Sequence, residues 1–240
     1  GSVLLPLALA CVGARLWIEK KIADTIRVEL AVAGFHRHKI GIGAVRVKLG
    51  DRSVRISNIS VRPTASATDG PQATLNLKIE SIEASGIRYR KAGNGDNHRE
   101  VVVGEVAIHS PSINYSGVRS GSASDSARIV TAGDRMRFSI GTFTLTDADA
   151  RITTWSGKQQ SKYAVDGLDV VLTGFMSGYE DKPAFETIAV SLRDGAYTYN
   201  NGAMRLEADS ISFSIPDGGL SVGRFAMVPQ YGREEFARRP

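Results

Sequence analysis

Residues Val101 to Ile108 read VVVGEVAI, and the prediction of the fold rests on this pattern. Apolar side chains occupy positions one, three, six and eight of the octet, on either side of Gly104. In a regular strand positions one and three point to one face, and positions six and eight point to the other. A β-bulge at positions four and five places two residues in one step of the ladder, so all four apolar side chains return to one face. We therefore interpret the octet as a bent strand with a continuous apolar face.

The same octet recurs along the chain with Gly, Asp or Glu at position four. The alternative interpretation is that position four ends one short strand. The copies begin at irregular intervals, which disfavours a closed propeller with equal blades. They run from Ile40 to Val47, Leu77 to Ala84, Val101 to Ile108, Phe138 to Leu145, Tyr163 to Val170, Leu206 to Phe213 and Leu220 to Met227, with a weaker copy from Phe185 to Val190.

Short second strands follow most copies, after residues that are typical of tight turns. Sequential hairpins of this kind form an antiparallel meander. We expect a mainly β protein in which residues 35–240 form one repetitive domain, an elongated and twisted antiparallel sheet that is open as a groove or half-barrel. The predicted turns are Gly50-Asp51, Ser85-Gly86, Ser110-Pro111-Ser112, Asp147-Ala148-Asp149 and Asp194-Gly195.

The run from Val3 to Ile18 is almost wholly apolar and is followed at once by charged residues. As a helix it would be about 24 Å long, somewhat short of the roughly 30 Å hydrocarbon core of a bilayer. We predict that residues 1–18 form an uncleaved membrane anchor; a signal peptide, a lipoprotein site ending at Cys11 and a buried core helix are the alternatives. The anchor side chains are Leu4, Leu5, Leu7, Leu9, Val12, Leu16 and Trp17.

Helical spacing continues beyond the apolar run. Ile18, Ile22, Ile26, Leu30 and Ala33 recur at intervals of four, four, four and three, with charged residues between them. A glycine follows at position 34, and glycine commonly ends a helix. Residues 19–34 are therefore predicted to form an amphipathic helix whose apolar stripe covers the adjoining domain.

Catalytic and cofactor motifs are absent from the sequence. It has no nucleophile elbow, phosphate-binding loop or metalloprotease helix, and its single cysteine, Cys11, excludes an internal disulfide and a zinc site built from cysteine pairs. The net charge of +5 is spread along the chain, which argues against nucleic acid as a partner. We expect no enzyme activity, no cofactor and no metal site.

Longer segments carry a resemblance to a known family. The predicted anchor runs into IEKKI (Ile18 to Ile22), and HKIGIGAVRVKLGDRSVRISNISVRP follows (His38 to Pro63). LKIESIEASGIRY, VVVGEVAIHSPSINY and LSVGRFAMVPQYGREEFARR then begin at Leu77, Val101 and Leu220. In this order the segments resemble the N-terminal portion of bacterial AsmA-like envelope proteins, particularly the Bacteroidetes type. The resemblance covers nearly the whole chain and rests on strand patterns.

The resemblance implies a protein of the bacterial inner membrane, with a single N-terminal anchor and its bulk in the periplasm. Its β-groove would hold lipid acyl chains, and its function would be lipid carriage, outer-membrane assembly or envelope homeostasis. The implied partners are membrane lipids and other envelope proteins. The main alternative is a closed β-sandwich that serves as an envelope scaffold or protein-interaction module.

An apolar sheet face must be covered by the sheet itself, by a helix or by a ligand. The bulge interpretation places one set of octet side chains on that face and directs Glu105, Thr142 and Thr144 to the other. The candidate groove residues are Val103, Val106, Ile108, Ile140, Phe143, Leu145, Val165 and Leu168.

Overall fold

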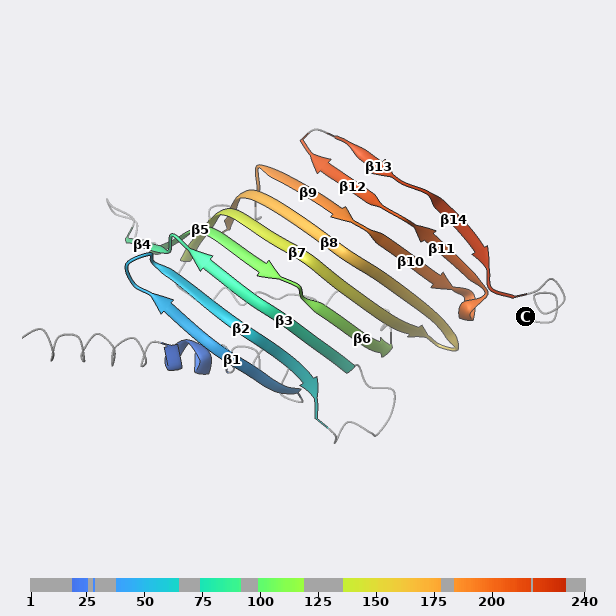
Figure 1. The fold of residues 1–240 in the computed structure, drawn as a ribbon, viewed down its shortest axis with the longest axis horizontal. Coiled ribbons are helices and arrows are strands. Elements are labelled where there is room, and N and C mark those ends of the chain that lie inside the picture. The colour runs from blue at the N-terminus through green and yellow to red at the C-terminus, as the bar shows by residue number, and fades with distance from the viewer. Residues whose placement is uncertain are drawn as a thin grey trace, which may run out of the picture.

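The computed structural model describes residues 19–25, 28, 38–64, 74–91, 99–118, 136–177, 184–216 and 218–231. This part of the chain is mainly β, as predicted, and its fourteen strands join in one sheet (Figure 1). The strands are β1 His38–Lys48, β2 Ser53–Pro63, β3 Thr74–Ser85, β4 Arg88–Lys91, β5 Arg99–His109, β6 Ser112–Val118, β7 Met136–Ser156, β8 Gln159–Ser177, β9 Thr187–Leu192, β10 Asp194–Tyr199, β11 Met204–Ala208, β12 Ile211–Ile215, β13 Leu220–Val222 and β14 Phe225–Pro229. The short 3-10 helix η2 spans Asn200–Gly202.

The N-terminal predictions are only partly covered by the described residues. Residues 19–25 and 28 are helical, and the rest of the segment 19–34, for which an amphipathic helix is predicted, lies outside the described residues. The anchor predicted for residues 1–18, including Leu4, Leu16 and Trp17, lies outside the described residues. Among those that are described, no helix is both long enough and apolar enough to cross a bilayer.

The fourteen strands form nine long lines across the sheet. Four strands, β1, β2, β7 and β8, each make a line alone. The other ten make five lines of two strands placed end to end: β3 with β4, β5 with β6, β9 with β10, β12 with β11, and β13 with β14. For example, β9 and β10 both pair antiparallel with β8, and β5 and β6 both run parallel to β7. The nine lines lie side by side in the order in which they occur in the chain.

One junction departs from the predicted antiparallel meander. β7 runs parallel to β5 and β6, with Met136 opposite Arg99 and Trp155 opposite Val118. The prediction of a wholly antiparallel sheet was therefore wrong, and the sheet is mixed. The physical reason is the place where the chain re-enters the sheet: β7 begins beside the start of β5, and a strand that enters at the same end as its neighbour runs parallel to it.

Most of the predicted turns are interruptions within a line. Only Gly50-Asp51 reverses the chain, between β1 and β2. The predicted turns at Ser85-Gly86, Ser110-Pro111-Ser112, Asp147–Asp149 and Asp194-Gly195 were wrong, because the chain continues across the sheet at each of them. Positive φ angles at Gly86, Ser110 and Asp147 explain the error, since turns and bulges select the same residue types.

The single apolar face that the octet predicts is confirmed in β1, but the predicted β-bulge is not, because the pairing of β1 with β2 keeps one register on both sides of Gly43. Ile40, Ile42, Val45 and Val47 are the less exposed side chains, and the alternation shifts by one residue where Gly43 and Ala44 are both exposed. The alternative, in which position four ends a short strand, was wrong for this copy because β1 is continuous. The neighbouring β2 shifts at the same place, at Asn58, so that pairing resumes in register between Ala44 and Ser57.

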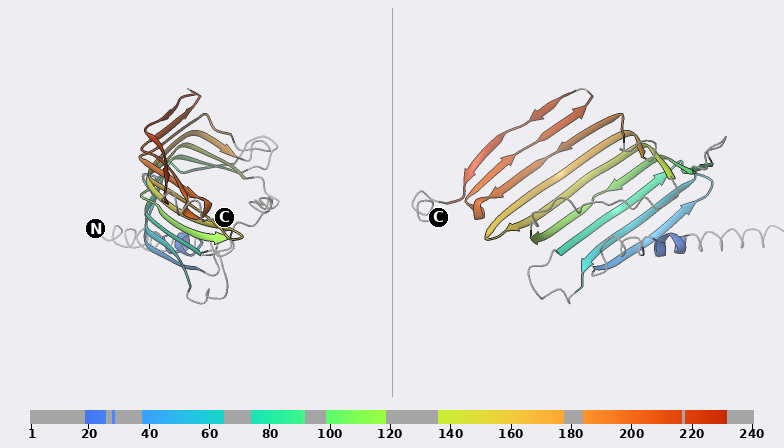
Figure 2. Two further views of the ribbon diagram at one scale, coloured as in Figure 1. Left: turned by 90° about the vertical axis from the view of Figure 1, so that its right-hand side faces the viewer. Right: turned by 180° about the vertical axis from the view of Figure 1, so that it is seen from behind.

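These shifts line up across the sheet as two creases. We call them the first crease, through Gly43, Asn58, Glu80, Ser110, Asp147 and Gly167, and the second crease, through Gly86, Gly104, Gly141 and Gly174. The pairing of β7 with β8 changes register at the first crease, and such bulges bend and twist the strands that contain them. The sheet is accordingly curved into a trough, which is seen end-on in the left view of Figure 2.

The second crease depends on glycine because the backbones approach closely there. A Cβ atom on Gly141 would lie 2.6 Å from the carbonyl oxygen of Gly104, whereas a Cβ atom on Gly50 would meet nothing within 4 Å. We expect Gly141→Ala to lower the free energy of unfolding by about 1–3 kcal/mol, on the scale of overpacked sites. Gly50→Ala is the matched control, with a change within about 0.5 kcal/mol. Urea unfolding followed by circular dichroism measures both, and equal losses would contradict the close approach.

Candidate functional site

One row of apolar residues crosses the whole sheet. Residues that pair across neighbouring strands point to the same face. Starting from Val45 in β1, the partners can be followed from strand to strand through all nine lines, and every position is apolar. The row is Val45, Ile56, Ile82, Ile108, Leu145, Val170, Val190, Phe213 and Leu220.

Two further rows flank it on the same face. One lies beside the second crease and consists of Val47, Val54, Ala84, Val106, Phe143, Leu172, Ile188 and Ile215. The other lies beyond the first crease and consists of Ile40, Val61, Leu77, Ile113, Ala150, Val165, Gly195, Ala208 and Phe225. We call the face that carries the three rows the apolar face; no ionisable residue stands in any of them.

The opposite face is polar over most of its width. The corresponding row there contains Arg46, Arg55, Glu83, Ala107, Thr144, Val171, Ala189 and Ser214. Arg55 and Glu83 form an ion pair at 3.3 Å between neighbouring strands. The sheet is therefore strongly amphipathic at β1, β2 and β3, and beyond them this outer face is mixed, with Ala107, Val171 and Ala189 among hydroxyl side chains.

The eight groove residues predicted from sequence lie on the apolar face. Val103 pairs with Ile140, Val106 with Phe143, and Ile108 with Leu145, so the candidates from β5 and β7 form one patch. Val165 and Leu168 of β8 pair with Ala150 and Ala148 of β7 beside that patch. Glu105, Thr142 and Thr144 lie in the intervening positions, as the bulge interpretation requires.

The octet copies include Tyr163 and Ile188, but sequence reasoning missed Leu172 in β8 and Tyr197 in β10. Leu172 in β8 and Ile188 in β9 continue the row from Phe143, and the aromatic Tyr163 and Tyr197 stack with ring centroids 4.6 Å apart. The alternation Val170-x-Leu172 was the available signal for β8. No local signal identifies the partners of β9, because they depend on which line lies beside it.

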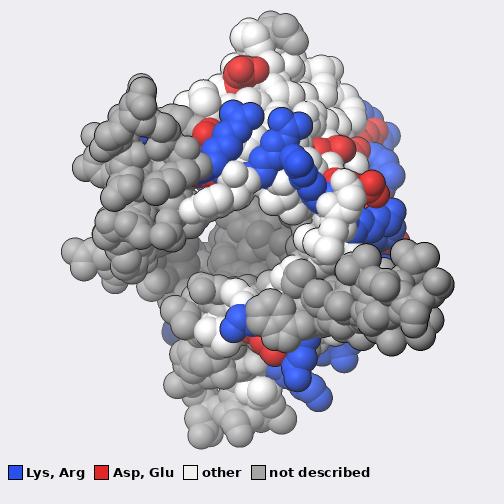
Figure 3. Space-filling view, turned by 90° about the vertical axis from the view of Figure 1, so that its left-hand side faces the viewer, with Lys and Arg blue, Asp and Glu red and all other residues white. Residues whose placement is uncertain are grey.

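The apolar face is not sealed. Within the described residues only seven hydrophobic side chains are buried, namely Val47, Ile59, Val61, Val103, Ala148, Ala203 and Ala208. Toward the β13 and β14 edge the side chains are open, with Leu220 69% exposed and Phe225 62% exposed. All described strands belong to the one sheet, so no second described sheet packs against this face. Figure 3 shows the molecule hollowed at its centre.

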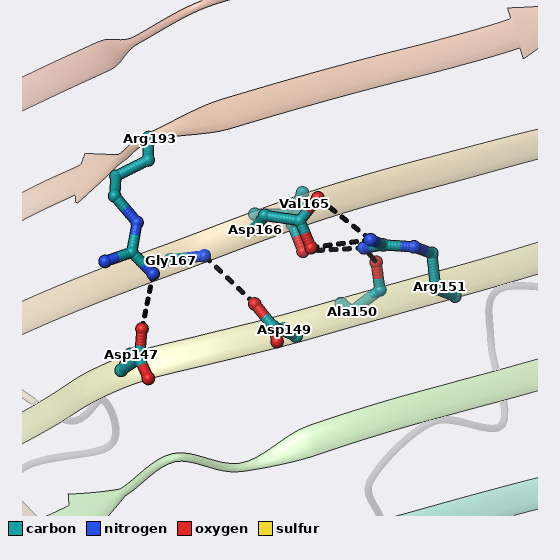
Figure 4. A network of polar contacts seen from close by, with 8 residues as sticks. All are labelled: Asp147, Asp149, Ala150, Arg151, Val165, Asp166, Gly167 and Arg193. Atoms are coloured by element: carbon teal, nitrogen blue, oxygen red, sulfur yellow. Dashed lines mark hydrogen bonds and ion pairs between the residues drawn. The ribbon is translucent and has the colours of Figure 1, made fainter.

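Polar contacts hold the first crease on the outer face (Figure 4). Asp166 accepts two hydrogen bonds from Nη2 of Arg151, at 2.6 and 2.8 Å. The backbone N–H of Gly167 donates to Asp149 at 3.1 Å, across the irregular pairing of β7 with β8. Asp149 thus accepts from a backbone N–H at the irregular pairing, and Asp166 ties β8 to the Arg151 side chain of β7, which gives both carboxylates a structural role.

Asp147 links three lines at the same crease. Its backbone N–H donates to Asp169 at 2.8 Å, and its carboxylate accepts a hydrogen bond from Arg193. This hydrogen bond, and then the negative charge of Asp147, raise the pKa of Arg193 above its ordinary value.

Comparison of the sequence with models of known protein families and with characterised proteins found no match.

The left-handed backbone at Asp147 generates a stability prediction. Asp147 has a φ of 54°, a conformation that costs most L-residues about 1–2 kcal/mol but that Asn and Asp adopt readily. We expect Asp147→Ala to lower the free energy of unfolding by about 1–2 kcal/mol, and Asp147→Asn by less than half as much. Urea unfolding at low and high salt measures both variants. Equal losses that vanish at high salt would show that the ion pair matters and the backbone conformation does not.

Proposed function

We propose that the apolar face binds the acyl chains of membrane lipids. The observation that carries this proposal is the set of three unbroken apolar rows that the described chain leaves partly exposed. Fully burying a Val, Leu, Ile or Phe side chain contributes about 1.5–3 kcal/mol. A half-exposed side chain has gained only part of this free energy on folding, and a ligand that covers the side chain would gain the rest.

The chemistry of the rows favours an aliphatic ligand. No hydrogen-bonding or charged side chain stands in them, so a polar ligand would lose its contacts with water and gain none in return. Nine lines spaced by about 4.8 Å give a row roughly 38 Å long. The hydrocarbon core of a bilayer is about 30 Å thick and contains two leaflets, so the row is longer than one acyl chain of a membrane lipid.

The proposed setting is the bacterial envelope, as the resemblance to AsmA-like proteins implies. Residues 1–18 would anchor the protein in the inner membrane, with the sheet in the periplasm. The proposed role is to carry lipid, or to assist outer-membrane assembly and envelope homeostasis, without catalysing a reaction. The apolar run from Val3 to Ile18 supports the membrane location, and the apolar face supports lipid as the cargo.

One observation favours a second candidate, a scaffold that binds another envelope protein. The last line, β13 with β14, pairs with the sheet on one side only. It carries exposed apolar side chains, including Val222 at 46% and Met227 at 56% exposure. An edge of this kind can accept a strand from another chain. In this alternative the apolar face would be covered by protein.

Two adjacent valines offer a matched test of the lipid proposal. Val170 lies on the apolar face between Leu145 and Val190, and Val171 lies on the outer face between Thr144 and Ala189. We expect a photo-crosslinking residue at Val170 to capture phospholipid in cells and one at Val171 to capture little, with the same contrast between Phe143 and Thr144. Mass spectrometry of the crosslinked products measures it. Capture of protein alone at Val170 and Phe143 would favour the scaffold.

Charge substitution at the same pair tests retention of lipid. Val170→Asp places a carboxylate among acyl chains and should lower the amount of co-purified lipid, whereas Val171→Asp should leave it unchanged. Thermal unfolding is measured alongside. A self-covered core would instead be destabilised by Val170→Asp, by about 3 kcal/mol or more on the scale of large core substitutions. Strong destabilisation with an unchanged lipid content would contradict the proposal.

A further inference from the structure

One end of the sheet combines basic and apolar side chains. The β1–β2 turn, residues 49–52, lies beside β4, because the backbone N–H of Ile87 donates to the carbonyl oxygen of Arg52 at 3.1 Å. Figures 1 and 2 show the turn, β4 and the helical residues 19–25 at the same end of the molecule. The helical segment is fastened there, since Glu19 accepts a hydrogen bond from the N–H of Val47 at 2.9 Å.

The turn and β4 project two large apolar side chains into solvent. Leu49 is 60% exposed and Tyr89 is 61% exposed. Each stands between basic residues: Lys48 and Arg52 flank the turn, and Arg88 and Arg90 flank Tyr89, all four being exposed. Asp51 is the only carboxylate in this set, and its contact with Lys48 is long, at 3.9 Å, and open to solvent; beside the set, Glu100 of β5 stands opposite Arg90. We call these seven residues the basic tip: Lys48, Leu49, Asp51, Arg52, Arg88, Tyr89 and Arg90.

We propose that the basic tip docks onto the surface of an anionic bilayer. Lys and Arg near such a surface are attracted to its negative potential. Tyr is favoured at the level of the lipid headgroups, because its ring is apolar and its hydroxyl is polar. Leu49 adds an apolar side chain that can enter the same region. The tip thus supplies both the charge and the partial insertion that interfacial binding requires.

The path of the chain supports this partner over an acidic protein. The helical residues 19–25 at this end directly follow the apolar run predicted to form the anchor. A bilayer is therefore the anionic surface that the tip meets first. Figure 3 views the molecule from this end and shows Lys and Arg side chains beside the central hollow. Docking of the tip would therefore also hold this end of the trough against the membrane, which is its source of lipid. The inference rests on the proposed membrane location and does not require that the trough carries lipid.

The test uses the full chain in proteoliposomes with Cys11→Ser as background. A single cysteine at Gly50→Cys, where there is open space around the Cα atom, carries an environment-sensitive fluorophore at the tip. Lys158→Cys, in the turn between β7 and β8 at the other end of these strands, carries the control label. The vesicles contain phosphatidylcholine alone or an equimolar mixture with phosphatidylglycerol, each with a headgroup quencher.

We expect quenching at position 50 to be several-fold stronger in the vesicles that contain phosphatidylglycerol, and to be weak at position 158 in both. Arg88→Glu with Arg90→Glu should reduce it to the value in phosphatidylcholine alone. The matched control reverses two adjacent basic residues at the far end of β1 and β2, Lys39→Glu with Arg62→Glu, and should leave it unchanged. Quenching at position 50 that ignores phosphatidylglycerol, or that survives the reversal at Arg88 and Arg90, would overturn the docking proposal.

Crosslinking at Val170 in the same preparations separates the two proposals. Loss of quenching at the tip in the Arg88→Glu, Arg90→Glu variant, with lipid still captured at Val170, supports docking as a separate function of the tip. Normal quenching at position 50 without lipid capture at Val170 would leave docking standing and remove lipid carriage. If the label at position 50 responds to an acidic protein and does not respond to the vesicles, the docking proposal is overturned and the lipid-carriage proposal is unaffected.

Discussion

The structure depends on the requirement that neighbouring strands shift their side-chain alternation at the same place. Side chains alternate between the two faces of a strand, so a shift of one residue in a single strand moves all subsequent apolar side chains to the polar face. Gly43 and Asn58 shift together, and so do Gly104 and Gly141. Because the shifts are shared, the row from Val45 to Leu220 remains apolar from edge to edge, and the sheet can bend without mixing its two faces.

The shared shifts also explain which residues stand at the creases. A bulge leaves backbone groups without ladder partners and requires unusual φ angles. At the second crease glycine allows a close approach of the backbones, because a side chain on Gly141 would collide with the carbonyl oxygen of Gly104, and Gly86 and Gly174 have the positive φ angles. At the first crease Asp147, Asp149 and Asp166 accept hydrogen bonds from arginine side chains and from a backbone N–H. Two chemical solutions therefore serve the same geometric constraint, and the acidic residues need no catalytic explanation.

In a single-layer sheet, the apolar face is uncovered unless another part of the protein or a ligand packs against it. The outer face can remain in water where its side chains are charged, as at Arg55 and Glu83, because charged groups are favourably hydrated. At the β1 edge the N–H of Val47 donates a hydrogen bond to the side chain of Glu19, so this N–H does not pair with a strand of another chain. The apolar face has no comparable cover within the described residues. Acyl chains would supply that cover in the proposed function, and the basic tip would bring the trough to the membrane that contains them.

The sequence by itself determined the β character of the chain and the residues that share a face. The octet spacing placed Val106 and Phe143 on one face and Thr144 on the other, because a period of two with one shift has only one arrangement that keeps all apolar side chains together. It also located several of the shifts, since Gly43, Gly104 and Gly141 stand at position four of their octets and are left out of the ladder pairs there.

Only the tertiary structure decided whether a bend continues a strand or reverses it. Asp147 lies within β7, yet its residue type suits a turn equally well, because both conformations have a positive φ. The parallel pairing of Val103 with Ile140 could not be predicted from the local sequence pattern either. It depends on the end of the sheet at which the chain re-enters, at Met136. The alignment of the bends into two creases, and thus the trough itself, arises from contacts between lines that no single strand encodes.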